Sequence, residues 1–369
     1  MVKLTNAVLN FTADSTERRA GYESFVEYYE TYKAGKTANE AGVSFAEMNK
    51  TMLQLFTDEI ERLSGKKLSD YTDAVQYFSF SDVSQAAFTV VGMLTDLIIP
   101  DALVKNYGMI ADVRNGGWGE SLKVELRPRD LFVVSKNGRN RRTADIKRFF
   151  RGEVSIVPEP RSITVGISLY DVLTGKYTLA ELVSRAAQSL EVAVARDIYF
   201  AFANAMNALP TTGTGALKVN GWSTEGFVKL VQKIEAWNGG AKAVAVGTKL
   251  ALSKVLPEST NARVLIGNDQ ALVTVGYLRE YFGTTLMELN QIADYTTEFG
   301  VLLPDDRIYI ICPGVDKPVK VFFEGSTTAH TEDSYSHANL LQTGTLYKSW
   351  GVGIATSALA GMISLTTGD

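Results

Sequence analysis

The chain has 369 residues, 46% of them hydrophobic and 21% charged, which is enough to bury a substantial core and excludes wholesale disorder. Its formal net charge of −4 excludes a strong overall nucleic-acid binder and a membrane-surface protein. The single cysteine, Cys312, leaves no intrachain disulfide, and the first residues lack the basic and apolar segments of a secretory signal. We expect two or three domains and synthesis in the cytosol.

Two amphipathic helices are predicted near the N-terminus, over residues 15–32 and 44–63. Ser44 and Glu47 fit a capping box, in which each residue satisfies a free backbone donor of the other. The apolar faces consist of Tyr22, Phe25, Tyr29 and Tyr32 in the first helix and Phe45, Met48, Met52, Phe56, Ile60 and Leu63 in the second. We interpret residues 1–82 as a helical arm, whose helices pair with each other or clasp a neighbouring subunit.

The most apolar stretch covers residues 86–100 and carries one charged residue, Asp96. A run of this length is too short to cross a bilayer, so we assign it to the buried core. A short helix and a strand are predicted to follow it, up to residue 113.

A long two-stranded ribbon is predicted over residues 118–156, because strand-like alternation flanks the turn signal Asn137-Gly138. An isolated ribbon is marginal in water, so something outside it should support it. Residues 121–151 contain ten basic and three acidic residues, among them Lys136, Arg139, Arg141, Arg142, Lys147, Arg148 and Arg151. This basic projection on an acidic body suits contact between copies of the chain. A solvated loop and phosphate contact with nucleic acid are the alternatives.

A helix of unusual length is predicted from Thr178 to Met206, where the sequence has no glycine or proline. Thr178 and Glu181 fit a second capping box, and Pro210 prevents continuation. The predicted apolar face is thin and rich in alanine, and it consists of Leu179, Leu182, Ala186, Leu190, Ala193, Val194 and Ile198. The polar remainder, assigned to solvent or to neighbours, consists of Glu181, Arg185, Gln188, Glu191 and Arg196. A long core helix is the simplest interpretation.

Alternating strands and helices over residues 221–325 predict a compact α/β domain around a small sheet. Within it, residues 307–314 and 318–325 are predicted as two strands around a Pro/Gly turn. The strand-like tail should return to the first domain.

No catalytic constellation stands out. His330 and His337 match no zinc pattern and lie in a segment interpreted as a polar loop, and Cys312 ends an apolar strand where a thiol is inert packing. No nucleotide-binding or hydrolase motif appears, since Gly35-Lys36-Thr37 lacks the strand and the first glycine of a phosphate-binding loop. We therefore expect no enzymatic activity, no metal and no cofactor.

The order of these parts resembles the major capsid protein of tailed bacteriophages, the Hong Kong 97-like fold. The segments that carry the resemblance are SITVGISLYDVLTGKYTLAELVSRAAQSLEVAVARDIYFAFA, PVKVFFEG and YKSWGVGIATSALAGMISL. It implies an α+β fold with a peripheral domain, an extended loop and an axial domain. The implied divisions are an arm at 1–82, the start of the peripheral domain at 83–117, the extended loop at 118–156, the peripheral domain with spine helix 178–206 at 157–214, the axial domain at 215–330 and a return at 331–369.

The resemblance implies self-assembly into hexamers and pentamers of an icosahedral head that encloses double-stranded DNA. The extended loop would lie across an adjacent subunit, and portal and scaffolding proteins would be partners. The protein would then be part of the virion and be assembled in the host cytoplasm, without membrane contact. A bacterial nanocompartment shell protein and an uncharacterised two-domain α/β enzyme are the alternatives.

Overall fold

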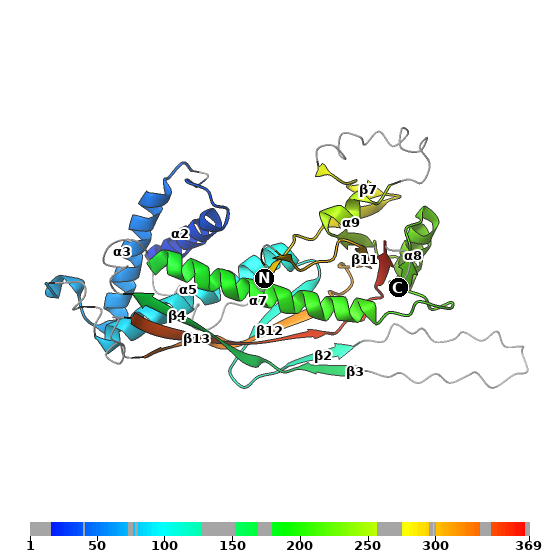
Figure 1. Ribbon diagram of the computed structural model, residues 1–369. Coiled ribbons are helices and arrows are strands. Elements are labelled where there is room, and N and C mark those ends of the chain that lie inside the picture. Colours follow the sequence, from blue (N-terminus) through cyan, green and yellow to red (C-terminus); the bar gives the residue numbers. More distant parts are fainter. Residues whose placement is uncertain are drawn as a thin grey trace, which may run out of the picture.

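The protein is an elongated α+β molecule in which two long helices lie along a long, narrow sheet (Figure 1). The computed structural model describes residues 16–39, 41–72, 77, 80–126, 152–168, 179–256, 275–294, 298, 300–332 and 341–365. The α+β class predicted from the sequence is confirmed.

The long sheet has four strands in the order β1-β12-β13-β4. Their bounds are β1 (Ala111–Gly116), β4 (Glu159–Ser168), β12 (Val319–Glu332) and β13 (Leu341–Ile354). β1 runs parallel to β12, and the other pairs are antiparallel. Side chains alternate across the sheet, so Val321 and Phe323 join the core under the long helices whereas Phe322 points to the opposite face.

Two helices cover one face of this sheet: α5 (Ser81–Tyr107) and α7 (Leu179–Asn207). α5 packs on β12 and α7 packs on β13, and the two helices pack on each other. The core between these elements contains Ile99, Leu103, Val194, Ile198 and Phe202.

The predicted long helix is confirmed as α7, but its buried surface is wider than the predicted stripe. Val183, Ala187 and Phe202 are fully buried although the prediction omitted them, because α7 is covered on one side by the sheet and on another by helices. Glu191 was assigned to solvent or to neighbours, and this is wrong: it is only 4% exposed and is hydrogen-bonded within the subunit. Thr178 of the predicted capping box lies outside the described residues.

The apolar stretch at 86–100 forms part of one helix, α5, that continues through Pro100. The prediction of a separate short helix after the proline is therefore wrong. Pro100 cannot donate a backbone hydrogen bond to the carbonyl of Asp96, but Ile98, Ile99 and Leu103 are buried around it and stabilise the continuous helix. In the described part of the chain, α5 is the one helix that is long and apolar enough to span a membrane. Within the protein, 65% of its most apolar 18-residue segment is buried.

The N-terminal helices are α2 (Thr16–Lys33) and α3 (Phe45–Ser64), followed by the short helix η1 (Leu68–Asp70). The capping box at Ser44 and Glu47 is confirmed, and its hydrogen bonds lower the pKa of the Glu47 carboxyl. α2 and α3 pack on each other and on α5 and α7. The buried face of this helical layer consists of Phe25, Tyr28, Tyr29, Met48, Met52, Phe56 and Ile60, while Leu63 of the predicted stripe is exposed. These faces are therefore used within the subunit rather than to clasp a neighbour.

The second sheet has six strands in the order β5-β14-β11-β6-β8-β7. Their bounds are β5 (Lys218–Asn220), β6 (Val244–Gly247), β7 (Glu280–Tyr281), β8 (Thr284–Glu288), β11 (Arg307–Ile311) and β14 (Gly361–Ser364). The helices α8 (Thr224–Trp237) and α9 (Lys249–Ser253) pack on it, and a small hairpin of β9 (Ala293–Asp294) and β10 (Gly300–Val301) follows β8. The predicted α/β unit around a small sheet is thus present.

The sheets divide the C-terminal half differently from the prediction. Residues 307–314 and 318–325 were predicted as two strands around a turn within one α/β domain, but β11 lies in the six-stranded sheet and β12 in the four-stranded one. The tail also divides, because β13 returns to the long sheet whereas β14 pairs with β11 and β5. His330 lies in β12 opposite Thr345, so this part is a strand and not a loop. His337 lies outside the described residues.

Candidate subunit interface

The base of the basic ribbon is an antiparallel pair of β2 (Leu122–Leu126) and β3 (Gly152–Ile156), with Leu122 opposite Ile156. The predicted ribbon is therefore confirmed at its base. The predicted contact residues Lys136, Arg139, Arg141, Arg142, Lys147, Arg148 and Arg151 all lie outside the described residues.

The long sheet supports this base on the face opposite the helices (Figure 1). Leu122 and Ile156 pack with Phe322 of β12 in a small apolar cluster. On β13, a Cβ at Gly351 would lie 2.8 Å from the carbonyl oxygen of Val157, and one at Gly353 would lie 2.8 Å from the Ile156 side chain. The two glycines let β3 approach the sheet backbone closely. No pattern in the sequence identified these two positions as contacts of the ribbon base.

The turn between β1 and β2 is tied to β12. The backbone N–H of Gly119 donates to Glu324 Oε1 at 2.7 Å, and the N–H of Gly117 donates to Glu120 Oε2 at the same distance. The Trp118 ring covers Gly325, where a Cβ would meet it at 2.3 Å. Trp118 nevertheless remains 59% exposed. The ribbon thus leaves the subunit from a fixed point beside an exposed aromatic ring.

An irregularity in β12 beside this point is fixed by a buried ion pair. The register of β12 against β13 shifts between Glu324 and Thr328. Asp96 of α5 accepts hydrogen bonds from the backbone N–H and hydroxyl of Thr327 and from Lys348 Nζ, the last at 2.6 Å. Both charged side chains are almost fully buried, so removing either would leave an unpaired buried charge. The contact fixes where the long strand bends.

A second polar site joins the N-terminal helical layer to the long helices. Glu191 of α7 accepts hydrogen bonds from Tyr29 Oη at 2.7 Å, Lys33 Nζ at 2.6 Å and Asn106 Nδ2 at 3.0 Å. Burial, together with the nearby carboxylate of Glu191, raises the pKa of the Tyr107 phenol. This carboxylate therefore bridges α2, α5 and α7.

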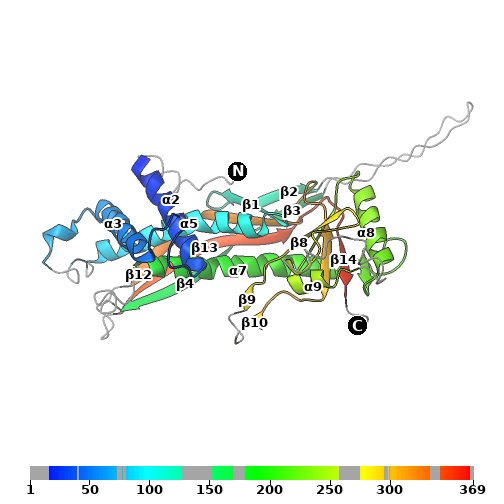
Figure 2. The ribbon, with the colours of Figure 1, turned by 90° about the horizontal axis from the view of Figure 1, so that it is seen from above.

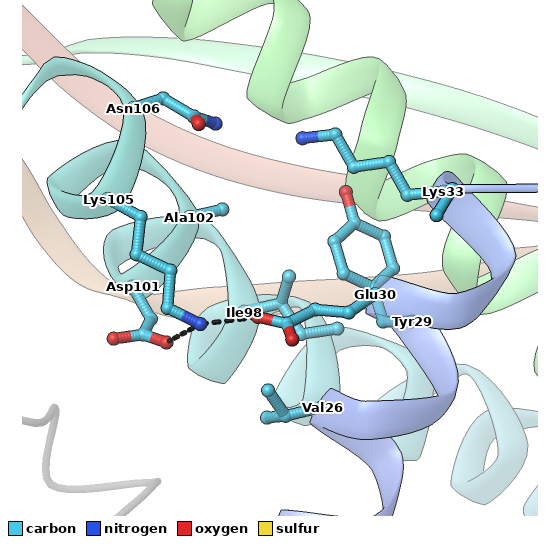
Figure 3. A pocket seen from close by; sticks show the side chains of 10 residues that line it. Val26, Tyr29, Glu30, Lys33, Ile98, Asp101, Ala102, Lys105 and Asn106 are labelled. Carbon is cyan, nitrogen blue, oxygen red and sulfur yellow. Dashed lines mark hydrogen bonds and ion pairs between the residues drawn. The ribbon is translucent and has the colours of Figure 1, made fainter. Parts of the chain in front are cut away.

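A pocket of about 270 Å³ lies beside this bridge, between α2 and α5 (Figure 3). Lys105 pairs there with Glu30 and with Asp101, and the hydrogen bond to Glu30 raises the pKa of Lys105. The charged side chains that line the pocket are thus paired with one another or, for Lys33, with Glu191. Among the residues that the structure describes, no group of three or more His, Cys, Asp or Glu side chains is placed to hold a metal ion.

One known protein family matches almost the whole chain. The model of a family described as "SPbeta prophage-derived putative capsid protein YonB" matches residues 24–364. Because the match covers nearly the whole chain, the chain belongs to this capsid protein family. Membership points to a structural role as a component of the virion.

Solved structures of viral and virus-like shells also resemble the chain at low sequence identity. The bacteriophage PhiM1 mature capsid has 9% identity and a TM-score of 0.45, over 70% of this chain and 86% of that one. The capsid of cyanophage P-SCSP1u has 12% identity and a TM-score of 0.44, over 70% and 87%. A virus-like particle from Pyrococcus furiosus has 10% identity and a TM-score of 0.40, over 72% and 96%. No curated protein matches the chain. The family assignment rests on the family model.

Proposed function

We propose that this chain is a major capsid protein with the Hong Kong 97-like fold, which assembles with copies of itself into hexamers and pentamers of an icosahedral head. The head would enclose double-stranded DNA and be assembled in the host cytoplasm with portal and scaffolding proteins. Membership of the capsid protein family is the observation that carries this proposal. The role is structural, so no catalytic step is assigned to any residue.

Within the shell, the basic ribbon is the proposed contact between subunits. Its anchored base supports this assignment, because β2 and β3 are held on the sheet by Leu122, Ile156 and Phe322. The contact residues are Lys136, Arg139, Arg141, Arg142, Lys147, Arg148 and Arg151. Complementary charge at such a contact sets the register between copies and disfavours wrong pairings.

The test replaces Arg139, Arg141 and Arg142 together with Glu. We expect the variant to remain a soluble, folded subunit that forms no shells, because the charge reversal makes the contact repulsive. Shells are counted by negative-stain electron microscopy, and folding is checked by size-exclusion chromatography and circular dichroism. A matched Arg→Lys variant at the same three positions keeps the charge and should assemble.

Two results would contradict the proposal. Full-sized particles from the Glu variant would exclude the ribbon as the contact. Particles of the parent chain that contain host proteins but no DNA after production in infected cells would favour a nanocompartment shell instead of a phage head.

A further inference from the structure

A lysine and an aspartate meet inside the core between α5 and the long sheet. Figure 2 shows α5 lying along β12 and β13, and it contacts both strands. The side chain of Lys348 on β13 is 5% exposed, and that of Asp96 on α5 is 1% exposed. Lys348 Nζ lies 2.6 Å from Asp96 Oδ1. A primary amine and a carboxyl group are therefore held in contact in a site that is closed to solvent, so any reaction between them is unimolecular.

The other polar groups around this pair are arranged as a buried amide bond needs them. Asp96 Oδ2 accepts a hydrogen bond from the backbone N–H of Thr327 at 2.6 Å, and the Thr327 hydroxyl donates to Oδ1 at 2.5 Å. Lys348 Nζ also donates to the carbonyl oxygen of Gly325 at 3.2 Å, beside the Phe323 ring. An amide between the two side chains would thus keep a donor for its oxygen and an acceptor for its N–H.

We propose that Lys348 and Asp96 condense into an amide bond, which cross-links β13 to α5 within one subunit. A proton first moves from Nζ to Oδ1, which removes both buried charges. The amine nitrogen then attacks Cγ, and the Thr327 N–H stabilises the negative charge that develops on Oδ2. The Thr327 hydroxyl carries a second proton from the nitrogen to Oδ1. The Nζ–Cγ bond forms, the Cγ–Oδ1 bond breaks, and one water molecule leaves without oxidation or reduction.

A second buried lysine shows why this pair is selected. Lys320 Nζ lies 2.6 Å from Asp316 Oδ1, the same distance as in the pair of Lys348 and Asp96. The Asp316 side chain is 24% exposed, however, and Lys320 has another carboxylate, that of Asp112, at 3.6 Å. A carboxylate in contact with water keeps its charge and is a poor target for an amine. Burial of the carboxyl group therefore distinguishes the reactive pair from an ordinary ion pair.

The bond joins two positions that are 252 residues apart in the sequence. A cross-link over so long a segment restricts the unfolded chain strongly, so it opposes unfolding of the subunit. It also makes permanent the contact at which the register of β12 against β13 shifts, between Glu324 and Thr328. This inference concerns the single subunit and does not depend on the proposed function.

The experiment is intact-mass spectrometry of the folded full chain over several days after purification. We expect the parent to be lighter than its sequence by one water molecule, and fragment spectra of a digest to join the peptides that contain residues 96 and 348. Lys348→Arg keeps the charge but lacks the primary amine, so it should retain its full mass. Lys320→Arg is the matched control and should still lose water. Thr327→Val should slow the loss at least about tenfold, because the proton carrier is missing.

A parent chain that keeps its full mass overturns the proposal. So does the same loss of water from Lys348→Arg, because the dehydration then arises elsewhere in the chain. If Lys348→Arg does not fold, Asp96→Asn replaces it. That variant should release ammonia in place of water and reach the same final mass as the parent, since both form the same amide, and unequal final masses overturn the cross-link. An unchanged rate in Thr327→Val overturns the proton route through its hydroxyl.

Discussion

The helical layer at the N-terminus and the basic ribbon were both expected to project from the body of the subunit. In the structure they differ in how much apolar surface they bury against that body. The layer buries its aromatic and methionine side chains against α5 and α7 in one continuous core cluster. The ribbon is held at its base by three buried side chains and by two glycines of β13. The number of apolar side chains that an element places on the body therefore distinguishes a part of the fold from a projection.

The largest expected effect comes from removing each element in turn. Deleting residues 1–72 would expose the apolar faces of α5 and α7, so we expect an aggregated or unfolded chain. Replacing residues 127–151 with a short Gly/Ser turn should leave a folded subunit that makes no shells. Light scattering and thermal unfolding by circular dichroism measure both. A folded, soluble subunit from the first deletion would show that the layer is a removable arm.

An intermediate effect is expected from Glu191→Ala. The substitution leaves Tyr29 and Asn106 without their buried acceptor, and it removes the ion pair with Lys33. We expect the free energy of unfolding to fall by about 2–3 kcal/mol, measured by urea denaturation. Glu153→Ala is the matched control on the ribbon, where the pair with Lys123 is exposed, and it should cost less than about 0.5 kcal/mol. Equal losses would contradict the distinction between the two regions.

The smallest effect on stability is expected from Gly351→Ala. The new methyl group would meet the carbonyl oxygen of Val157, so β3 must shift on the sheet. We expect about 1 kcal/mol of destabilisation, because the change lies at the edge of a small cluster, but a clear loss of shells, because the ribbon leaves in a new direction. Ser349→Ala, two residues earlier on β13, is the control. Normal shells from Gly351→Ala would show that the direction of the ribbon base is not critical.

Local patterns were sufficient wherever one segment decides its own structure. The 3.6-residue period and the lack of glycine and proline predicted α7, and the S-x-x-E pattern predicted the start of α3. The ribbon base followed from strand alternation around a turn signal. Charge counts singled out the basic segment, and the resemblance to capsid proteins agreed with the family match. The contact residues proposed on that segment stay predictions.

These local patterns could not predict which side chains, helices and strands pack together within the chain, because this depends on residues far apart in sequence. Burial of Glu191 requires α2 and α5 to supply its donors from more than 80 positions away. A separate short helix was predicted after the apolar stretch that ends at Pro100, because the tertiary packing that keeps α5 continuous through the proline is invisible in the sequence. The division of β11 and β12 between two sheets was also missed, because a Pro/Gly turn indicates a reversal without saying which strand lies alongside.

The sequence by itself determined most helices, most strands, the base of the ribbon and the family, since these depend on periodicity, local hydrogen bonding and composition. Only the tertiary structure decided that the N-terminal helices belong to the core, that two glycines of β13 let β3 pack closely on the sheet, and that Phe282 is exposed at the β7–β8 turn. Burial and proximity are properties of the whole packed chain, because each surface is covered by whichever distant segment fits it.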